Sequence, residues 1–137
     1  MIPLSREQYE KAVDFILNNA RPLERQLWLH HTGRSGLDEV IGCLRAFQNE
    51  EGGFGRALEP DHRMNSSSVL ATLEALSILL ELKAVEDPLG KSALNWLVDK
   101  DGPWDSQRLL WPYLPARPED APHAPWWNTE DLENTFG

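Results

Sequence analysis

The sequence predicts an all-α protein. Apolar residues recur at helical spacing in five separate segments, and glycine, proline or capping residues stand at the ends of these segments. No segment shows the apolar and polar alternation that is typical of a strand. With 137 residues the chain is long enough to bury one core, so we expect residues 1–137 to form a single all-α domain.

The first two helices are predicted from their capping residues. Ser5 and Gln8 have the spacing of a capping box, and helical spacing of apolar residues follows to residue 20, so we expect a helix over residues 5–20. Pro22 suits the first position of a second, shorter helix, because proline lacks the amide hydrogen that is unpaired there in any case. Gly33 is placed to end this helix in a left-handed conformation.

The third helix and the loop after it are predicted from an apolar stripe and a cluster of glycines. The stripe runs over residues 37–48, and Gly52, Gly53 and Gly55 prevent the helix from continuing. Residues 49–65 then form a polar loop that is longer than most connections. Loops of this length often carry function, so we place the candidate chemistry in or near it.

Two further helices and an irregular segment complete the chain. Asn65 and the three serines Ser66 to Ser68 offer several N-caps for a helix over residues 69–82 that is apolar on most of its circumference. Asp87 and Pro88 begin a fifth helix, which Gly102 and Pro103 end. Its inward-facing residues are expected to be Leu89, Ala93, Leu94, Trp96 and Leu97. Residues 105–128 are rich in proline and tryptophan, so we expect an irregular segment ordered by aromatic packing.

Charge and composition exclude several classes of function. The chain has 22 Asp and Glu against 13 Lys and Arg, a formal charge of −9, and therefore repels polyphosphate backbones, so nucleic acid is not an expected partner. The one cysteine, Cys43, excludes an internal disulfide framework and a multi-cysteine metal site. No apolar run is long enough to span a membrane, and no secretory signal is visible, so a cytoplasmic location is expected.

The chain contains an approximate repeat. A shift of 50 residues relates residues 37–55 to residues 87–105 and superposes an apolar helix end, a glycine turn and an aromatic residue. The matched pairs are Leu44 with Leu94, Phe47 with Leu97, Gly52 with Gly102, and Phe54 with Trp104. Units of this kind need neighbours to bury their remaining faces, so we expect the helices to stack in pairs.

The string LRAFQNEEGGFG, residues 44–55, resembles the QW-type repeat of squalene and terpene cyclases and the glycine-rich repeat of protein prenyltransferase β subunits. The resemblance implies an α/α toroid, in which helical hairpins form a ring around a central cavity. It implies that the repeats are structural staples between helices and are not catalytic. In the second copy Val98 stands where the glutamine is expected, so that staple is absent.

The same resemblance implies an architecture more than an activity. The Asp-x-Asp-Asp acid motif of the squalene cyclases does not occur, and Cys43 lacks the ligand pattern of the prenyltransferase zinc site, so no cofactor and no metal site are expected. A complete ring needs more hairpins than this chain supplies. We therefore expect either a homo-oligomer or a missing C-terminal half that completes the toroid.

The candidate catalytic residues are Glu59, Asp61 and His62, which lie inside the polar loop in a stretch of four residues. A carboxylate beside an imidazole can orient the ring for proton transfer. The structural alternative is that the two carboxylates satisfy backbone amides and the dipole of the helix that follows.

The candidate substrate-binding residues are mostly aromatic. Aromatic faces stabilise cations, including the carbocations of terpene chemistry, and flat rings also stack on sugars. The structural alternative is an aromatic cap that closes the helical core. The set consists of Trp104, Trp111, His123, Trp126 and Trp127.

Three hypotheses about function follow. The first is a terpene cyclase-like or prenyltransferase-like protein that acts on or binds an apolar isoprenoid in a central helical cavity, with Asp61 and His62 as acid and base. The second is a carbohydrate-active hydrolase or lyase in an α/α-barrel, with Glu59 and Asp61 as paired carboxylates and the tryptophans as sugar platforms. The third is a non-catalytic helical-repeat scaffold or binding module.

Overall fold

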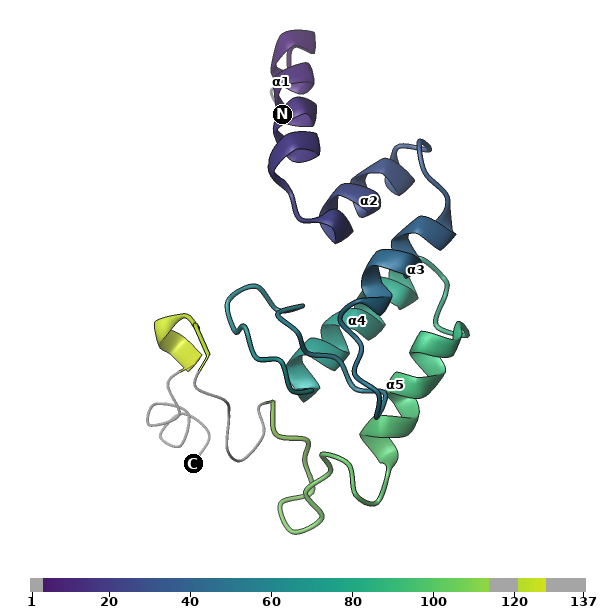
Figure 1. The fold of residues 1–137 in the computed structure, drawn as a ribbon, viewed down its shortest axis with the longest axis vertical. Helices are drawn as coiled ribbons and strands as arrows, with labels where there is room; N and C mark the ends of the chain where they lie inside the picture. The colour runs from purple at the N-terminus through teal and green to yellow at the C-terminus, as the bar shows by residue number, and fades with distance from the viewer. Residues whose placement is uncertain (1–3, 114–120, 128–137) are drawn as a thin grey trace. The chain divides into compact units, whose positions relative to one another are not determined.

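The computed structural model describes residues 4–113 and 121–127 of the chain and is all-α, as the sequence predicts (Figure 1). Within these ranges the only β pairing consists of three isolated bridges. The chain divides into two compact units, residues 1–45 and residues 46–137. The helices are α1 (Arg6–Asn19), α2 (Pro22–His31), α3 (Leu37–Arg45), α4 (Val69–Glu81), α5 (Pro88–Val98) and the short 3₁₀ helix η1 (Pro125–Trp127).

In the first unit, α1, α2 and α3 follow one another with α2 in contact with both of its neighbours. The capping box is confirmed: the Gln8 backbone N–H donates to the Ser5 hydroxyl at 3.2 Å, and the Ser5 N–H donates to the Gln8 side chain at 2.8 Å. Pro22 is the first residue of α2. Gly33 follows the end of α2 with a φ of +70°, the left-handed conformation expected of it.

The third helix ends at Arg45, three residues before the predicted end at residue 48. The chain turns back on itself directly afterwards. The Asn49 backbone N–H donates to the Gly53 carbonyl at 2.9 Å, and Gln48 forms an antiparallel bridge with Phe54. These bonds take the place of helical ones, because the three glycines allow a tight turn that a helix cannot make.

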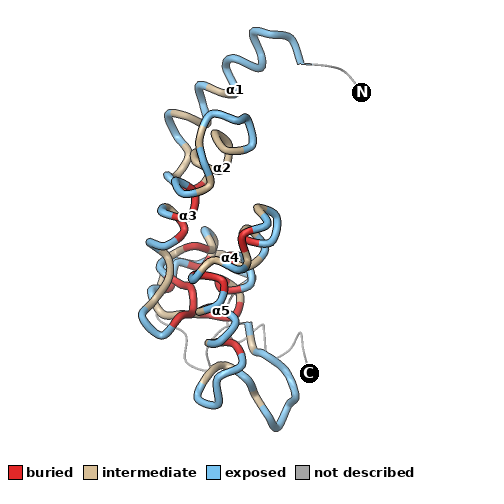
Figure 2. The backbone as a smooth tube through the Cα atoms, turned by 90° about the vertical axis from the view of Figure 1, so that its right-hand side faces the viewer, coloured by how far each residue is buried: buried red, intermediate tan, exposed pale blue. Residues whose placement is uncertain are grey.

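The second unit is built on the helical hairpin of α4 and α5, which contact each other. Among the candidate N-caps the structure uses Ser68, whose hydroxyl accepts from the Ala71 N–H at 3.1 Å. Asp87 caps α5 as predicted, because its carboxylate accepts from the Leu89 N–H at 2.9 Å. Buried residues gather on α4, on α5 and in the glycine turn (Figure 2).

The glycine turn is packed against both helices of this hairpin. A side chain at Gly53 would clash with Ser67 and with the ring of Trp96, and Gly52 has a φ of +103°. Phe54 is fully buried, and its backbone N–H donates to the Thr72 hydroxyl at 2.9 Å. The turn therefore delivers one large aromatic side chain into the core.

Gln48 fastens this turn to the start of α5. Its side-chain amide donates to the Gly52 carbonyl at 2.9 Å and to the Leu89 carbonyl at 3.1 Å. The second bond joins residues 41 positions apart in the chain. Gln48 is thus a side-chain staple between a repeat turn and a following helix.

The second copy of the repeat differs from the first. Leu94 was expected to face inward, but its side chain is 46% exposed, whereas its counterpart Leu44 is fully buried. Trp104 is also more exposed than Phe54. The prediction that Leu94 faces inward is wrong. In this copy Val98, an exposed residue, stands where a glutamine staple is expected.

The segment after α5 is irregular over its described residues, as expected, and is tied back to the hairpin at two points. The Trp111 indole N–H donates to the Leu97 carbonyl at the end of α5, at 2.8 Å. The Leu70 backbone N–H at the start of α4 donates to the Tyr113 carbonyl at 3.1 Å. Among the described helices, none is long and apolar enough to cross a bilayer.

Candidate functional site

The loop that carries the predicted catalytic residues has a strained backbone. Arg56 and Ala57 have φ values of +52° and +62°, in the left-handed region that residues other than glycine avoid. Their N–H groups donate to the carbonyls of Asn65 and Met64, at 3.2 and 3.0 Å. These bonds close the loop on itself. Strain of this kind is concentrated at functional sites more often than elsewhere.

Residues 121–127 lie against this loop. The Arg63 N–H donates to the Pro122 carbonyl at 3.0 Å, and the Ala124 N–H donates to the Asp61 carbonyl at 2.8 Å. An antiparallel bridge pairs His62 with His123. Residues about 60 positions apart in the sequence are therefore brought together as a two-stranded contact.

The Asp61 carboxylate is the centre of this contact. One oxygen, Oδ2, accepts from the Trp126 indole N–H at 3.0 Å, and Oδ1 accepts from the Trp127 indole N–H at 3.1 Å. Burial raises the pKa of this carboxyl group, but the hydrogen bonds from Trp127, Glu59 and Trp126 outweigh burial and lower the pKa below its ordinary value. Asp61 is therefore an ionised acceptor of two indole donors.

Glu59 has the opposite electrostatic environment. Burial is the largest cause that raises the pKa of Glu59, and its hydrogen bond to Asp61 together with the negative charge of that residue raises it further. When two carboxyl groups are hydrogen bonded to each other, the repulsion between two negative charges favours the state in which the pair shares one proton. In this pair Asp61 has the charge and Glu59 holds the proton more tightly than an ordinary glutamate.

The histidines complete the group. His62 is buried, and its ring stacks on the ring of His123 with 5.6 Å between centroids and 18° between planes. The same His62 ring meets Trp127 edge-on at 6.0 Å. We call the set Glu59, Asp61, His62, His123, Trp126 and Trp127 the Asp61 cluster.

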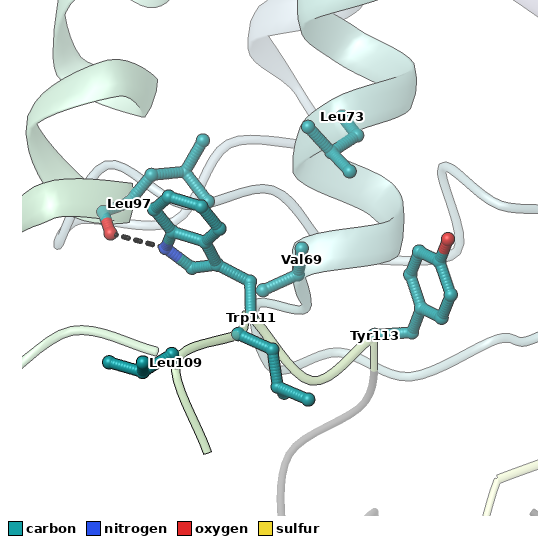
Figure 3. A pocket seen from close by; sticks show the side chains of 7 residues that line it. Val69, Leu73, Leu97, Leu109, Trp111 and Tyr113 are labelled. Atoms are coloured by element: carbon teal, nitrogen blue, oxygen red, sulfur yellow. Dashed lines mark hydrogen bonds between the residues drawn. The ribbon is translucent and has the colours of Figure 1, made fainter. Parts of the chain in front are cut away.

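A second feature of the same unit is an apolar groove between the α4–α5 hairpin and the segment that follows α5 (Figure 3). Its cavity volume is about 510 Å³. Figure 3 shows Trp111 and Tyr113 on either side of Val69, with the Trp111 indole bonded to Leu97. The lining residues are Val69, Leu73, Leu97, Leu109, Leu110, Trp111 and Tyr113.

The predicted site residues are thus divided between two places. Trp111 lines the groove, and Trp104 packs against it with 4.4 Å between ring centroids. The remaining predicted residues belong to the Asp61 cluster, and none of them lines the groove.

Sequence reasoning missed Leu109 and Leu110 as members of the groove. The signal was an apolar pair next to a tryptophan in a proline-rich segment, which has no period to indicate where the side chains point. Leu73 was expected only as part of an apolar helix. It is 42% exposed because it forms a wall of the groove.

Comparisons with known proteins add no assignment: no protein-family model, no curated protein and no solved structure matches this chain. Within residues 4–113 and 121–127, no group of three histidine, cysteine, aspartate or glutamate side chains is arranged to hold a metal ion. The chemistry of the two features described above is therefore the basis for any functional argument.

Proposed function

We propose that this protein binds an apolar, isoprenoid-like small molecule in the groove between the α4–α5 hairpin and residues 109–113. The observation that carries the proposal is the groove itself. Its volume of about 510 Å³ lies within the range of small-molecule sites, roughly 300–1,000 Å³, and its walls are aliphatic and aromatic, as in most such sites. An apolar ligand gains free energy there by leaving water.

The resemblance of residues 44–55 to the repeats of terpene cyclases and prenyltransferase β subunits supports an isoprenoid as the ligand class. The Gln48 staple supports that resemblance, because it joins a repeat turn to a later helix, α5. Trp111 and Trp104 supply aromatic surface at the groove, with their ring planes tilted by 56° to each other. Such surface suits the unsaturated chain of an isoprenoid.

The geometry favours a carbohydrate-active enzyme less. Glycosidases need two carboxylates separated by about 5 Å or more, with the sugar between them. Glu59 and Asp61 are instead hydrogen bonded to each other. The indole edges of Trp126 and Trp127 are also held by Asp61.

A second candidate function is proton transfer by the Asp61 cluster. The observation that favours it is the hydrogen-bonded pair of carboxyl groups, in which the pKa of Glu59 is raised by burial and by Asp61 while the pKa of Asp61 is lowered by its hydrogen bonds. Incubation with farnesene in heavy water tests this function. In this reaction Glu59 donates a deuteron to one carbon of a double bond, and the Asp61 carboxylate removes a proton from a carbon next to the resulting cationic carbon, so that a double bond is restored. Deuterium should therefore enter the recovered farnesene with the wild-type protein and with Glu50→Gln, but not with Glu59→Gln. Equal incorporation in all three proteins, or none in any, would exclude the proposal.

The binding proposal is tested with a matched pair of variants on one helix. Leu73→Glu places a charge in the groove wall, whereas Leu80→Glu places the same charge on an exposed residue of α4 outside the groove. We expect equilibrium dialysis with labelled farnesol to show binding by the wild-type protein and by Leu80→Glu. Leu73→Glu should bind at least about tenfold more weakly, since an unpaired charge is costly in an apolar site.

Two outcomes would reject the binding proposal. The first is that farnesol does not bind to the wild-type protein at any accessible concentration. The second is that Leu73→Glu binds farnesol as tightly as Leu80→Glu does. Circular dichroism of both variants establishes that each retains the helical fold, so that a loss of binding reports on the groove.

A further inference from the structure

One polar side-chain group that lines the groove makes no hydrogen bond to the described residues 4–113 and 121–127. Among its lining residues only Trp111 and Tyr113 have polar side-chain atoms. The Trp111 indole N–H is already committed to the Leu97 carbonyl at 2.8 Å. In the described parts of the chain no hydrogen bond involves the hydroxyl of Tyr113, which is half exposed. This hydroxyl can donate one hydrogen bond and accept another.

The charges next to the groove are unfavourable for an anionic head group. Asp105 adjoins the lining, because its backbone N–H donates to the Leu110 carbonyl at 2.9 Å. A hydrogen bond from the Arg108 backbone N–H is the main cause that keeps the pKa of Asp105 below its ordinary value, so this carboxyl is ionised. Glu74, directly after Leu73 on α4, is a second exposed carboxylate.

The nearby cations are already paired. Among the residues of this region that the structure describes, Arg108 lies 3.9 Å from the Asp105 carboxylate, and Lys100 lies 3.1 Å from the Asp101 carboxylate. A diphosphate needs several positive or N–H donors that converge on it. None of the seven lining residues is charged, and the chain as a whole has a formal charge of −9.

We propose that the groove takes an uncharged isoprenoid with a single hydroxyl head group, and that the Tyr113 hydroxyl binds that head group. This inference rests on the proposed binding function and specifies the ligand of the same site. The apolar walls hold the chain of the ligand, and one neutral hydrogen bond orients its end. A diphosphate ester of the same chain is excluded by the acidic surroundings.

Three ligands with one carbon skeleton test the proposal: farnesol, farnesene and farnesyl diphosphate, each measured by equilibrium dialysis. The wild-type protein should bind farnesol roughly three- to tenfold more tightly than farnesene, the value of one neutral hydrogen bond. Farnesyl diphosphate should bind most weakly. Tyr113→Phe should abolish the preference for farnesol over farnesene while the affinity for farnesene stays unchanged.

Tyr9→Phe is the matched control, because Tyr9 is a half-exposed tyrosine of α1 that does not line the groove. It should keep the wild-type preference. If farnesol and farnesene bind equally well to the wild-type protein, or if the diphosphate binds most tightly, the inference is wrong and the proposed function stands. If none of the three ligands binds, the proposed function itself fails and the inference fails with it.

Discussion

The Trp127 indole N–H donates to the Asp61 carboxylate at 3.1 Å across 66 residues of sequence. Trp126 makes the same kind of bond to the other carboxylate oxygen at 3.0 Å. Two adjacent indoles can reach one carboxylate because η1 places both rings toward the loop that carries Asp61. Asp61 therefore attaches residues 121–127 to the loop through two side-chain bonds and one backbone bond, beside the contacts made by His62 and Arg63.

Asp61→Ala should weaken the attachment of residues 121–127 to the loop. The variant removes the acceptor of both indole donors, while the two backbone bonds of the contact remain. Because the indoles can bond to water instead, we expect a loss of about 1–2 kcal/mol in the free energy of unfolding. Amide hydrogen exchange of residues 121–127 should become faster. Asp101→Ala, which removes a surface ion pair, should change neither measurement appreciably.

Glu59→Gln should stabilise the protein at neutral pH. The pKa of Glu59 is raised in the folded state, so its stabilising contribution is present below its ordinary value of about 4.3 and is lost as the pH rises through the raised pKa. Glutamine imitates the protonated form at every pH. The variant should therefore have a higher Tm than the wild type at pH 7, and the difference should shrink toward pH 4.

The Asp61 carboxylate makes stability depend on pH in the opposite direction. The pKa of Asp61 is lowered in the folded state, so its contribution is present above about 3.9 and is lost as the pH falls through the lowered pKa. Asp61→Asn should thus lower Tm at pH 7 and approach the wild type in strong acid. Thermal melts of the wild type and both variants from pH 3 to pH 8 check these signs. The difference in Tm between Glu59→Gln and the wild type should be larger at pH 7 than at pH 4. A smaller difference at pH 7 than at pH 4 would contradict a raised pKa of Glu59.

Gln48→Ala should destabilise the second unit. The substitution removes two hydrogen bonds, to Gly52 and to Leu89, from a side chain that is only half exposed. We expect a loss of about 1–3 kcal/mol in the free energy of unfolding, measured by urea denaturation. The exposed Gln107 provides the comparison, and Gln107→Ala should change stability by less than about 0.5 kcal/mol. Equal effects of the two substitutions would show that Gln48 is not a staple.

Ala57→Gly should relieve backbone strain in the loop. A left-handed conformation costs a residue with a Cβ atom about 1–2 kcal/mol, whereas glycine adopts it freely. Ala46→Gly is the reference, because Ala46 does not have a positive φ and the substitution there adds only chain entropy. In urea denaturation Ala57→Gly should be more stable than Ala46→Gly by about 1–2 kcal/mol. No difference between them would mean that the loop stores no strain at Ala57.

Equivalent residues in the two copies of the repeat differ in burial. Leu44 and Leu94 occupy equivalent positions in the sequence, yet the first is buried and the second is exposed. Aligning the two copies at a shift of 50 residues compares only their residue types. It does not show whether a neighbouring helix covers the same face of each repeat helix. The presence of Gln48 in one copy, and of Val98 in the other, is the local difference that accompanies the change in packing.

The sequence by itself determined which segments are helical and which residue types begin them, whereas the end of α3 lies at Arg45 rather than at residue 48. Ser5 and Asp87 act as N-caps as predicted, and Ser68 is the one used among the candidates at residues 65–68, because capping depends on bonds that span only two or three positions. The tertiary structure alone decided that residues 121–127 meet the loop at Asp61, and that Leu109 and Leu110 join α4 and α5 around a groove. Those contacts join residues that no local pattern relates, so only the folded chain specifies them.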